Sequence, residues 1–247
     1  MRRYGLLLIS TLMVLMMISF PLMTAMAASR TFTVGLVPKA LISPFWITLV
    51  DMAEEAAQEK GINVVVTSPP NETAVAEQIN MIEDLIERKV DLLAIGACSP
   101  VAIIPVVKKA LAAGIPVVML DTQTPLPEVE VTSLIGSDNI AGGRIAGEYA
   151  VQLLEGKGRI AMIEGAPGHQ SNEDRKQGFN EVVGKHSGIE IVASQPANWE
   201  RAMGMTVMEN ILQAHPHIDL VFAACDEMAL GALKAIAAAG KKIPVLS

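Results

Sequence analysis

The two tryptophans of this 247-residue chain lie where predicted strands give way to helices. Trp46 ends the segment 43–46, after an early strand, and Trp199 ends the segment 195–199, after a later one. Aromatic residues make up only 4% of the chain, so a core built by periodicity would rarely place both indoles on loops. An indole at the mouth of an α/β sheet suits a ligand with an apolar face and polar edges, such as a sugar ring. The alternative is that both are hydrophobic staples at helix entries.

The sequence contains no recognisable catalytic motif. It has no G-x-S-x-G turn, no P-loop lysine motif and no G-x-G-x-x-G after the first strand. The pair His215 and His217 resembles metal ligands, but it lies between a helix end and a strand, where turns commonly carry such residues. No nucleophile, base and orienting group come together. We therefore predict a binding protein with no enzymatic activity and no cofactor or metal.

The N-terminus has the pattern of a secretory signal. Arg2 and Arg3 precede an apolar run over residues 5–20, and the triplet 25–27 fits an A-x-A cleavage site. A membrane anchor is the alternative, but the apolar run is short for a span. We therefore predict that residues 1–27 are removed and that the mature protein, from Ala28, is periplasmic.

Charge and cysteine content narrow the classes of partner. The chain has a formal charge of −7, which becomes −9 without the leader because two arginines and no acids are lost. An acidic exported protein is a poor partner for nucleic acid or an anionic membrane surface. Cys98 and Cys225 are too few for a disulfide scaffold, and we interpret them as separate thiols.

Short β-branched runs alternate with amphipathic stretches through the first half of the mature chain. The predicted strands are 31–37, 63–67, 92–95, 116–120 and 131–135, and the predicted helices are 44–60, 73–88 and 101–113. Residues 64–66 and 117–119 are continuously apolar, as in a parallel sheet that is covered on both faces. The alternation predicts a doubly wound α/β domain.

A second, similar series starts at Gly136. It has predicted strands at 159–163, 190–194 and 220–223, and predicted helices at 172–185, 201–214 and 227–239. We therefore expect a signal peptide at 1–27, an N-terminal α/β lobe at 28–136 and a C-terminal α/β lobe at 137–247. A last strand begins near Ile243 with no helix to cover it, which predicts a truncated or frameshifted sequence.

Five motifs occur in the order of a known family. They are Ser43-Pro44-Phe45-Trp46, the segment 114–121, the segment 136–139 with Gly142-Gly143, the segment 194–199, and the segment 226–231. Over residues 31–247 the chain closely resembles the ribose-binding branch of the type 1 periplasmic sugar-binding proteins, and allose-binding proteins look similar. The resemblance implies two Rossmann-like lobes with parallel sheets and a central hinge, closing on a monosaccharide. It also implies that C-terminal elements of the family are missing here.

The resemblance implies partners as well as a fold. The leading expectation is the solute-binding component of an importer, which delivers a pentose, a hexose or a related polyol to an inner-membrane ABC permease. The alternative is a periplasmic sensor that presents its sugar-bound form to a chemoreceptor or histidine kinase. An intracellular repressor-type sensor is disfavoured because a signal peptide stands where a helix-turn-helix should be.

Candidate ligand-binding residues follow from the same resemblance. Phe45 and Trp46 would pack on one side of the sugar ring and Trp199 on the other, while Asp121 would accept hydrogen bonds from hydroxyls and Arg175 would donate them. The remaining candidates are Ser43, Asn172 and Cys225.

Several positions depart from the ribose-binding pattern. Thr122 replaces a second arginine, Ser43 and Cys225 replace asparagines, and Gly96 replaces a polar residue. The polar shell therefore differs, and another pentose, a hexose or a polyol is expected as readily as ribose. We interpret Asp226 as a helix cap rather than a ligand residue.

Overall fold

The computed structural model describes residues 30–122 and 126–247. In this part of the chain, helices pack outside sheets of parallel strands. The predicted signal at 1–27 lies outside these residues. Phe32–Ser247 form one compact unit that contains two sheets. Within the described residues no helix is long and apolar enough to cross a membrane.

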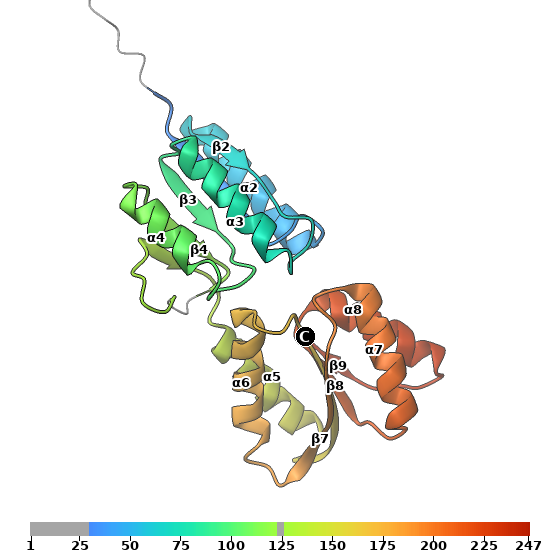
Figure 1. The fold of residues 1–247 in the computed structure, drawn as a ribbon. Coiled ribbons are helices and arrows are strands. Elements are labelled where there is room, and N and C mark those ends of the chain that lie inside the picture. Colours follow the sequence, from blue (N-terminus) through green and yellow to red (C-terminus); the bar gives the residue numbers. More distant parts are fainter. Residues whose placement is uncertain (1–29, 123–125) are drawn as a thin grey trace, which may run out of the picture. The chain divides into compact units, whose positions relative to one another are not determined.

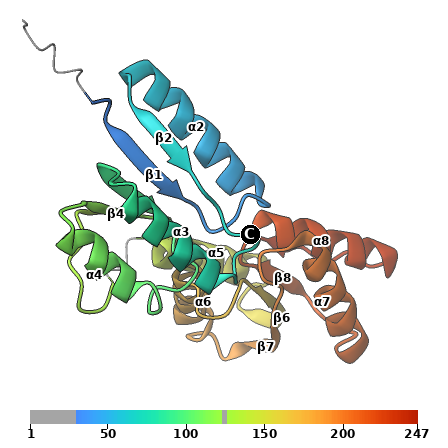
Figure 2. The same ribbon diagram turned by 45° about the horizontal axis from the view of Figure 1, so that its top comes forward.

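The first sheet has five parallel strands in the order β2-β1-β3-β4-β5. Figure 1 labels β2, β3 and β4 of this sheet. Its strands are β1 (Thr33–Val37), β2 (Asn63–Val66), β3 (Leu92–Ile95), β4 (Val117–Leu120) and β5 (Ser133–Ile135), and its helices are α2 (Pro44–Lys60), α3 (Val75–Glu87) and α4 (Ile104–Ala112). Helices α3 and α4 share one buried cluster with β1, β3 and β4. Helix α2 lies on the opposite face, as right-handed crossovers require for this strand order (Figure 2).

Local chemistry sets the ends of the helices. Helix α2 matches its predicted range: Ser43 is the N-cap, Pro44 occupies the first turn, and Gly61 ends the helix with a left-handed φ of 64°. Helix α3 begins two residues later than predicted. There the Asn71 side chain accepts from the Thr73 backbone N–H and hydroxyl, and this turn holds the chain out of the helix.

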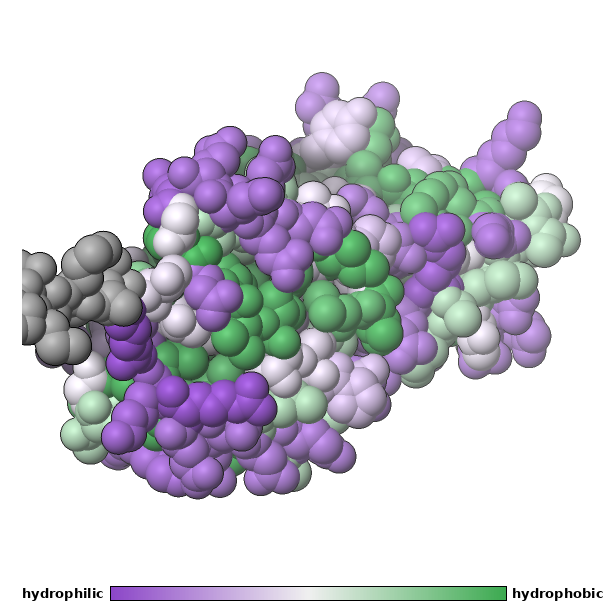
Figure 3. Space-filling view, turned by 90° about the horizontal axis from the view of Figure 1, so that it is seen from above, coloured by the Kyte–Doolittle hydropathy of each residue, from purple (hydrophilic) through white to green (hydrophobic). Residues whose placement is uncertain are grey.

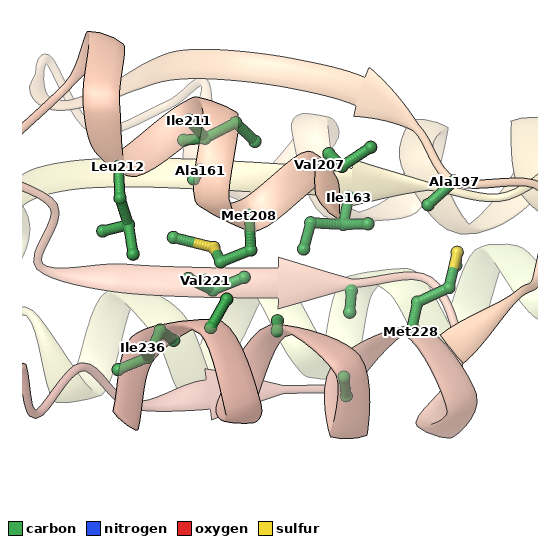
Figure 4. Close-up of a cluster of buried hydrophobic side chains, with 14 of the residues drawn as sticks. Ala161, Ile163, Ala197, Val207, Met208, Ile211, Leu212, Val221, Met228 and Ile236 are labelled. Atoms are coloured by element: carbon green, nitrogen blue, oxygen red, sulfur yellow. The ribbon is translucent and has the colours of Figure 1, made fainter. Parts of the chain in front are cut away.

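The second sheet repeats the arrangement with four parallel strands in the order β7-β6-β8-β9. Its strands are β6 (Lys157–Glu164), β7 (Gly188–Pro196), β8 (Leu220–Ala223) and β9 (Val245–Leu246), and its helices are α5 (Asn139–Leu153), α6 (Gln170–Val183), α7 (Arg201–Ala214) and α8 (Asp226–Ala238). Alternate side chains of the two central strands point to opposite faces. Ala161, Ile163, Val221 and Ala223 pack against α7 and α8 (Figure 4).

The intervening residues of β6 and β8 face α5 and α6. Ile160, Met162 and Leu220 belong to this cluster, and the rings of Phe179 and Phe222 stack there with centroids 4.2 Å apart. Both faces of the central strands are therefore covered. The predicted fold class, α/β with parallel sheets, is confirmed.

Helices α5 and α6 approach each other through glycines. A Cβ added at Gly178 would collide with the Ile140 carbonyl oxygen, and one added at Gly143 with the Arg175 carbonyl oxygen. Any larger residue would have to displace backbone rather than a side chain. The contact therefore fixes α6, and with it Arg175, relative to α5.

Apolar side chains also reach the surface. The face in Figure 3 shows apolar residues gathered between polar ones. Among the described residues, Phe45, Ile47 and Met52 are exposed on α2, and Ile145 and Tyr149 on α5.

Candidate functional site

The candidate site is a cavity of about 440 Å³ lined by segments that follow strands of both sheets. In each sheet the first strand lies between the second and third, as β1 does between β2 and β3 and β6 between β7 and β8. Open α/β sheets bind ligands at such switch points, beyond the carboxyl ends of the strands. The volume lies within the range of small-molecule pockets.

Most of the residues singled out from the sequence line this cavity: Ser43, Phe45, Trp46, Asp121, Arg175, Trp199 and Cys225. Asn172 does not. It is fully buried, its Oδ1 accepts from the Gly165 backbone N–H at 2.6 Å, and its Nδ2 donates to Glu173. The structure therefore does not bring Asn172 to the cavity, because α6 turns its amide toward the loop after β6. Ser171, its neighbour, lines the cavity instead.

Trp46 is held by the residue after β3. A Cβ at Gly96 would overlap the Trp46 indole, so only glycine leaves room for this ring. The indole of Trp46 thus occupies the space that a side chain at position 96 would fill. Trp46 is only 2% exposed, and Phe45 meets it edge-on with centroids 5.0 Å apart. The Lys39 ammonium lies 5.7 Å from the Trp46 ring centroid.

Trp199 repeats this arrangement in the second sheet. A Cβ at Gly165, directly after β6, would overlap the Trp199 indole. The Arg175 guanidinium carbon lies 5.8 Å from the ring centroid. Each indole therefore packs against a glycine at a strand end and has a cation within cation–π distance.

Three residues in or beside the cavity lining have strained backbone: Asp121 and Trp199 line it, and Asn198 precedes Trp199. Asp121, Asn198 and Trp199 have φ values of 59°, 51° and 67°, in the left-handed region that non-glycine residues seldom adopt. Such conformations cost about 1–3 kcal/mol each and cluster at functional sites. In this chain they set the direction of a carboxylate and an indole that both line the cavity.

Arg175 is oriented before any ligand is considered. Its Nε donates to Asn139 Oδ1 at 2.9 Å, and Nη1 donates to the Ala224 carbonyl at 2.5 Å. Asn139 is itself buried at the start of α5. Because a guanidinium carries five N–H donors, these two bonds fix its plane and leave donors for the cavity that it lines.

Lys39 is a cavity residue that sequence reasoning missed. It follows β1 by two positions, and its Nζ pairs with Asp121 Oδ2 at 2.9 Å. The two side chains are only 6% and 15% exposed, so this is a shielded ion pair. A lysine immediately after an apolar strand, at the binding edge of the sheet, was the available signal.

Glu72 and His169 were missed as well. Glu72 lines the cavity, and burial raises the pKa of its carboxyl to about 7, although Lys39 and a hydrogen bond from the Trp46 side chain oppose that rise. Burial and the nearby Lys39 lower the pKa of the His169 imidazole to about 4. At neutral pH the imidazole is therefore uncharged, and Glu72 is poised to gain or lose a proton.

The hydrogen bonds of His169 fix its tautomer. Its Nδ1 lies 2.9 Å from Trp199 Nε1, and its Nε2 lies 3.1 Å from the Glu72 carbonyl oxygen. An indole N–H can only donate and a carbonyl can only accept. Nδ1 is therefore the acceptor, and the proton is on Nε2.

Both cysteines are free thiols, as predicted. Cys225 lines the cavity at the N-cap position of α8, and burial raises the pKa of its thiol. Asp226 is the first residue of the helix rather than its cap, so that prediction was wrong. Its carboxylate lines the cavity and accepts from the Ser247 hydroxyl at 2.6 Å.

Metal ligands do not gather around this cavity. Across residues 30–122 and 126–247 there is no group of three or more His, Cys, Asp or Glu side chains placed to hold a metal ion. His215 and His217 lie between α7 and β8, as the sequence predicted.

Comparison with known proteins identifies the family. Residues 34–246 match the family described as the periplasmic binding protein domain. This chain belongs to the periplasmic binding protein family. The ribose import binding protein RbsB of Bacillus subtilis is 38% identical over 217 residues, which cover 88% of this chain and 69% of the relative. The D-allose-binding periplasmic protein of Escherichia coli is 32% identical over 231 residues, covering 91% and 74% respectively.

A solved structure places the same fold around a sugar. The ABC transporter periplasmic solute-binding protein of Actinobacillus succinogenes with bound D-allose superposes with a TM-score of 0.78 at 34% identity. The match covers 84% of this chain and 74% of that chain. The resemblance to the ribose- and allose-binding branch is confirmed. These relatives are solute-binding proteins rather than enzymes, which fits the prediction of a non-enzymatic protein.

Proposed function

We propose that this protein is the solute-binding component of an ABC importer and that it binds one uncharged monosaccharide or related polyol in the cavity. The observation that carries this proposal is the pairing of two indoles with a carboxylate and a guanidinium around one space of about 440 Å³. Indole faces suit the C–H faces of a sugar ring, and the charged groups suit its hydroxyls.

The charges in the cavity favour an uncharged ligand. Asp121 already faces Lys39, and Arg175 already bonds to Asn139 and Ala224. A ligand that carried a full charge would compete with these bonds, whereas hydroxyls can both donate and accept beside them. We therefore propose hydroxyl-rich neutral sugars rather than sugar acids or amino sugars.

The proposed contacts follow from this arrangement. Phe45 and Trp46 would stack on one side of the ring and Trp199 on the other, while Asp121 would accept from hydroxyls and Arg175 would donate to sugar oxygens. Ser43 and Cys225 would complete the wall, and Lys39 joins the proposed set.

The family also supports a location and a partner. We propose that the protein acts in the periplasm, that residues 28–136 and 137–247 are its two lobes, and that it delivers its ligand to an inner-membrane permease. We place import ahead of sensing because two of the three proteins compared above are named as import or ABC transporter proteins.

A sugar panel tests the proposal. Ribose, allose, other pentoses and hexoses, and inositols would be titrated while tryptophan emission and the melting temperature are followed. A bound ligand raises the free energy of unfolding by RT ln(1 + [L]/Kd), and the melting temperature rises with it. A panel in which no sugar or polyol changes either signal would refute the assignment.

Loss of the Asp121 carboxylate provides the first specific prediction. Asp121→Ala should weaken sugar binding by about 30- to 1000-fold, because a shielded charge-assisted contact contributes on the order of 2–4 kcal/mol. Titration calorimetry measures the effect. Asp51→Ala, which removes an exposed acid of α2, is the matched control and should bind normally. Equal affinity in the two variants would show that Asp121 does not contact the ligand.

A further inference from the structure

A chain of hydrogen bonds joins the two indoles of the cavity. The Trp46 side chain bonds to the Glu72 carboxyl group, the Glu72 carbonyl accepts from His169 Nε2, and His169 Nδ1 accepts from Trp199 Nε1. Glu72 follows β2 of the first sheet, whereas His169 precedes α6 of the second. The connection therefore crosses from one sheet to the other.

The residues of this connection are buried, so breaking one of its hydrogen bonds would leave a polar group without a partner. Trp46, Glu72 and His169 are only 2%, 7% and 2% exposed. His169 Nδ1 also lies 3.6 Å from the Glu72 carboxylate, so the two side chains are in contact as well as joined through the backbone. A buried imidazole or indole N–H without a partner destabilises the fold, because it has lost its bond to water and gained none in return. The indole of Trp199 therefore keeps its orientation only while His169 Nδ1 accepts its hydrogen bond.

We propose that Glu72 and His169 are positioning residues that tie the two indoles into one hydrogen-bonded unit across the two sheets. The Trp199 ring then takes its stacking position only when the loop that carries Glu72 is docked against His169. The expected effect on sugar affinity rests on the proposed function, whereas the hydrogen-bonded connection between the two indoles does not depend on it.

The charged neighbours of the unit belong to both sheets. Lys39 and Asp121 face Glu72 and His169 from the first sheet, and Asp174 and Arg175 lie on the helix that His169 precedes. Protonating His169 at Nδ1 removes the acceptor for Trp199, while changing the charge of Glu72 acts most directly on the bond to Trp46. Each indole therefore reports on a different partner.

Nitrogen-15 labelling of tryptophan gives a direct test without any sugar. The chain has two tryptophans, so two indole N–H signals are expected, and Trp199→Phe assigns them. At pH 7.5, His169→Leu should shift the Trp199 signal toward the position of a free indole. His169→Gln should restore much of the wild-type shift, because its amide can accept from Trp199 and donate to the Glu72 carbonyl. An identical Trp199 signal in wild type and His169→Leu would overturn the proposal.

A pH titration supplies the second arm. In wild type the Trp46 signal should move with a midpoint near 7, and the Trp199 signal with a midpoint near 4. Glu72→Gln, which keeps the backbone carbonyl, should abolish the first movement and leave the second. A Trp199 signal that does not move on acidification while the fold persists by circular dichroism would contradict the role of His169.

Affinity separates this inference from the proposed function. For a sugar that wild type binds, His169→Leu should lose about tenfold or more in affinity and His169→Gln about threefold or less. If no sugar binds but the indole signals behave as expected, the proposed function fails and the connection stands. If sugar binds equally to all variants, the connection has no positioning role.

Discussion

Two glycines leave the space in which the two tryptophan rings of the cavity pack. Gly96 and Gly165 each follow a central strand, and each lies against an indole at a distance that admits no side chain. From the sequence, Gly96 was read only as the loss of a polar group. In the structure it is the space into which Trp46 fits. The fit of Trp46 thus depends on a glycine that lies 50 residues away in the chain.

The first prediction at this scale concerns that space. Gly96→Ala should displace the Trp46 ring, lower the free energy of unfolding by about 1–3 kcal/mol through overpacking, and weaken sugar binding by about tenfold or more. Chemical unfolding and calorimetry measure the two effects. Adding Trp46→Phe to Gly96→Ala should recover part of the stability, because the smaller ring leaves room for the methyl group. Additive losses in the double variant would show that the two residues do not compete for space.

The buried Glu72 carboxyl predicts a pH dependence of stability. Its folded-state pKa, about 7, exceeds the unfolded value of 4.5, so the folded protein holds the proton more tightly. Its contribution is fully present below pH 4.5 and is lost as the pH rises through 7. Glu72→Gln lacks this loss. It should be more stable than wild type at pH 8, by on the order of 2–3 kcal/mol, and close to wild type at pH 4.5.

Melting temperatures of both proteins across this range provide the measurement. His169 acts in the opposite direction: its pKa of about 4 lies below the unfolded value of 6.5, so stability falls as the pH drops from 6.5 to 4. Both proteins retain His169, so a fall in stability between pH 6.5 and 4 is expected in both. A difference that does not change with pH would mean that Glu72 is not buried in solution.

The position of a residue in its loop or helix determines whether its side chain reaches the cavity. Loops that follow parallel strands meet at one edge of the sheet, so Ser43, Asp121 and Trp199 could be placed there from the order of strands alone. Asn172 does not reach the cavity because it lies on a helix, where one step of 100° separates a cavity-facing side chain from a buried one. Ser171 and Arg175 lie four residues apart on the same face of α6, and both line the cavity.

A close helix contact predicts a sharp difference between neighbouring residues of α5. Gly143→Ala should destabilise the fold by about 2 kcal/mol or more, because the new methyl group meets backbone of α6 at Arg175. Gly142→Ala has open space at the same point and should be neutral or stabilise the helix by up to about 1 kcal/mol. Urea unfolding of the two variants measures both values. Equal stabilities would show that α5 and α6 can move apart freely.

At the scale of the whole molecule, periodicity was sufficient to predict the fold. Continuously apolar strands between amphipathic helices leave few arrangements other than covered parallel sheets, and both sheets have this form. Periodicity does not report which loops meet across the sheets. Glu72 and His169 are 97 residues apart, and each alone reads as a polar loop residue. Their pairing depends on the arrangement of two complete sheets, which local patterns do not encode.

The two thiols of the chain make the occupancy of the cavity chemically measurable. Only a thiolate reacts readily with an alkylating reagent. Cys98 is buried, and burial together with Glu72 raises its pKa to about 12, so it should remain unmodified in the folded protein. Cys225 is half-buried and lines the cavity, and its raised pKa predicts a slow reaction that accelerates with alkaline pH.

Alkylation kinetics followed by mass spectrometry should therefore show one adduct per folded chain. A bound sugar should slow its formation, while a sugar that does not bind should leave the rate unchanged. Cys225→Ser supplies the control, because it should take up no label until the protein is unfolded. Two adducts in the folded state, or a rate indifferent to a sugar known to bind, would contradict this expectation. The native protein thus contains its own footprinting probe, able to rank ligands without an added fluorophore.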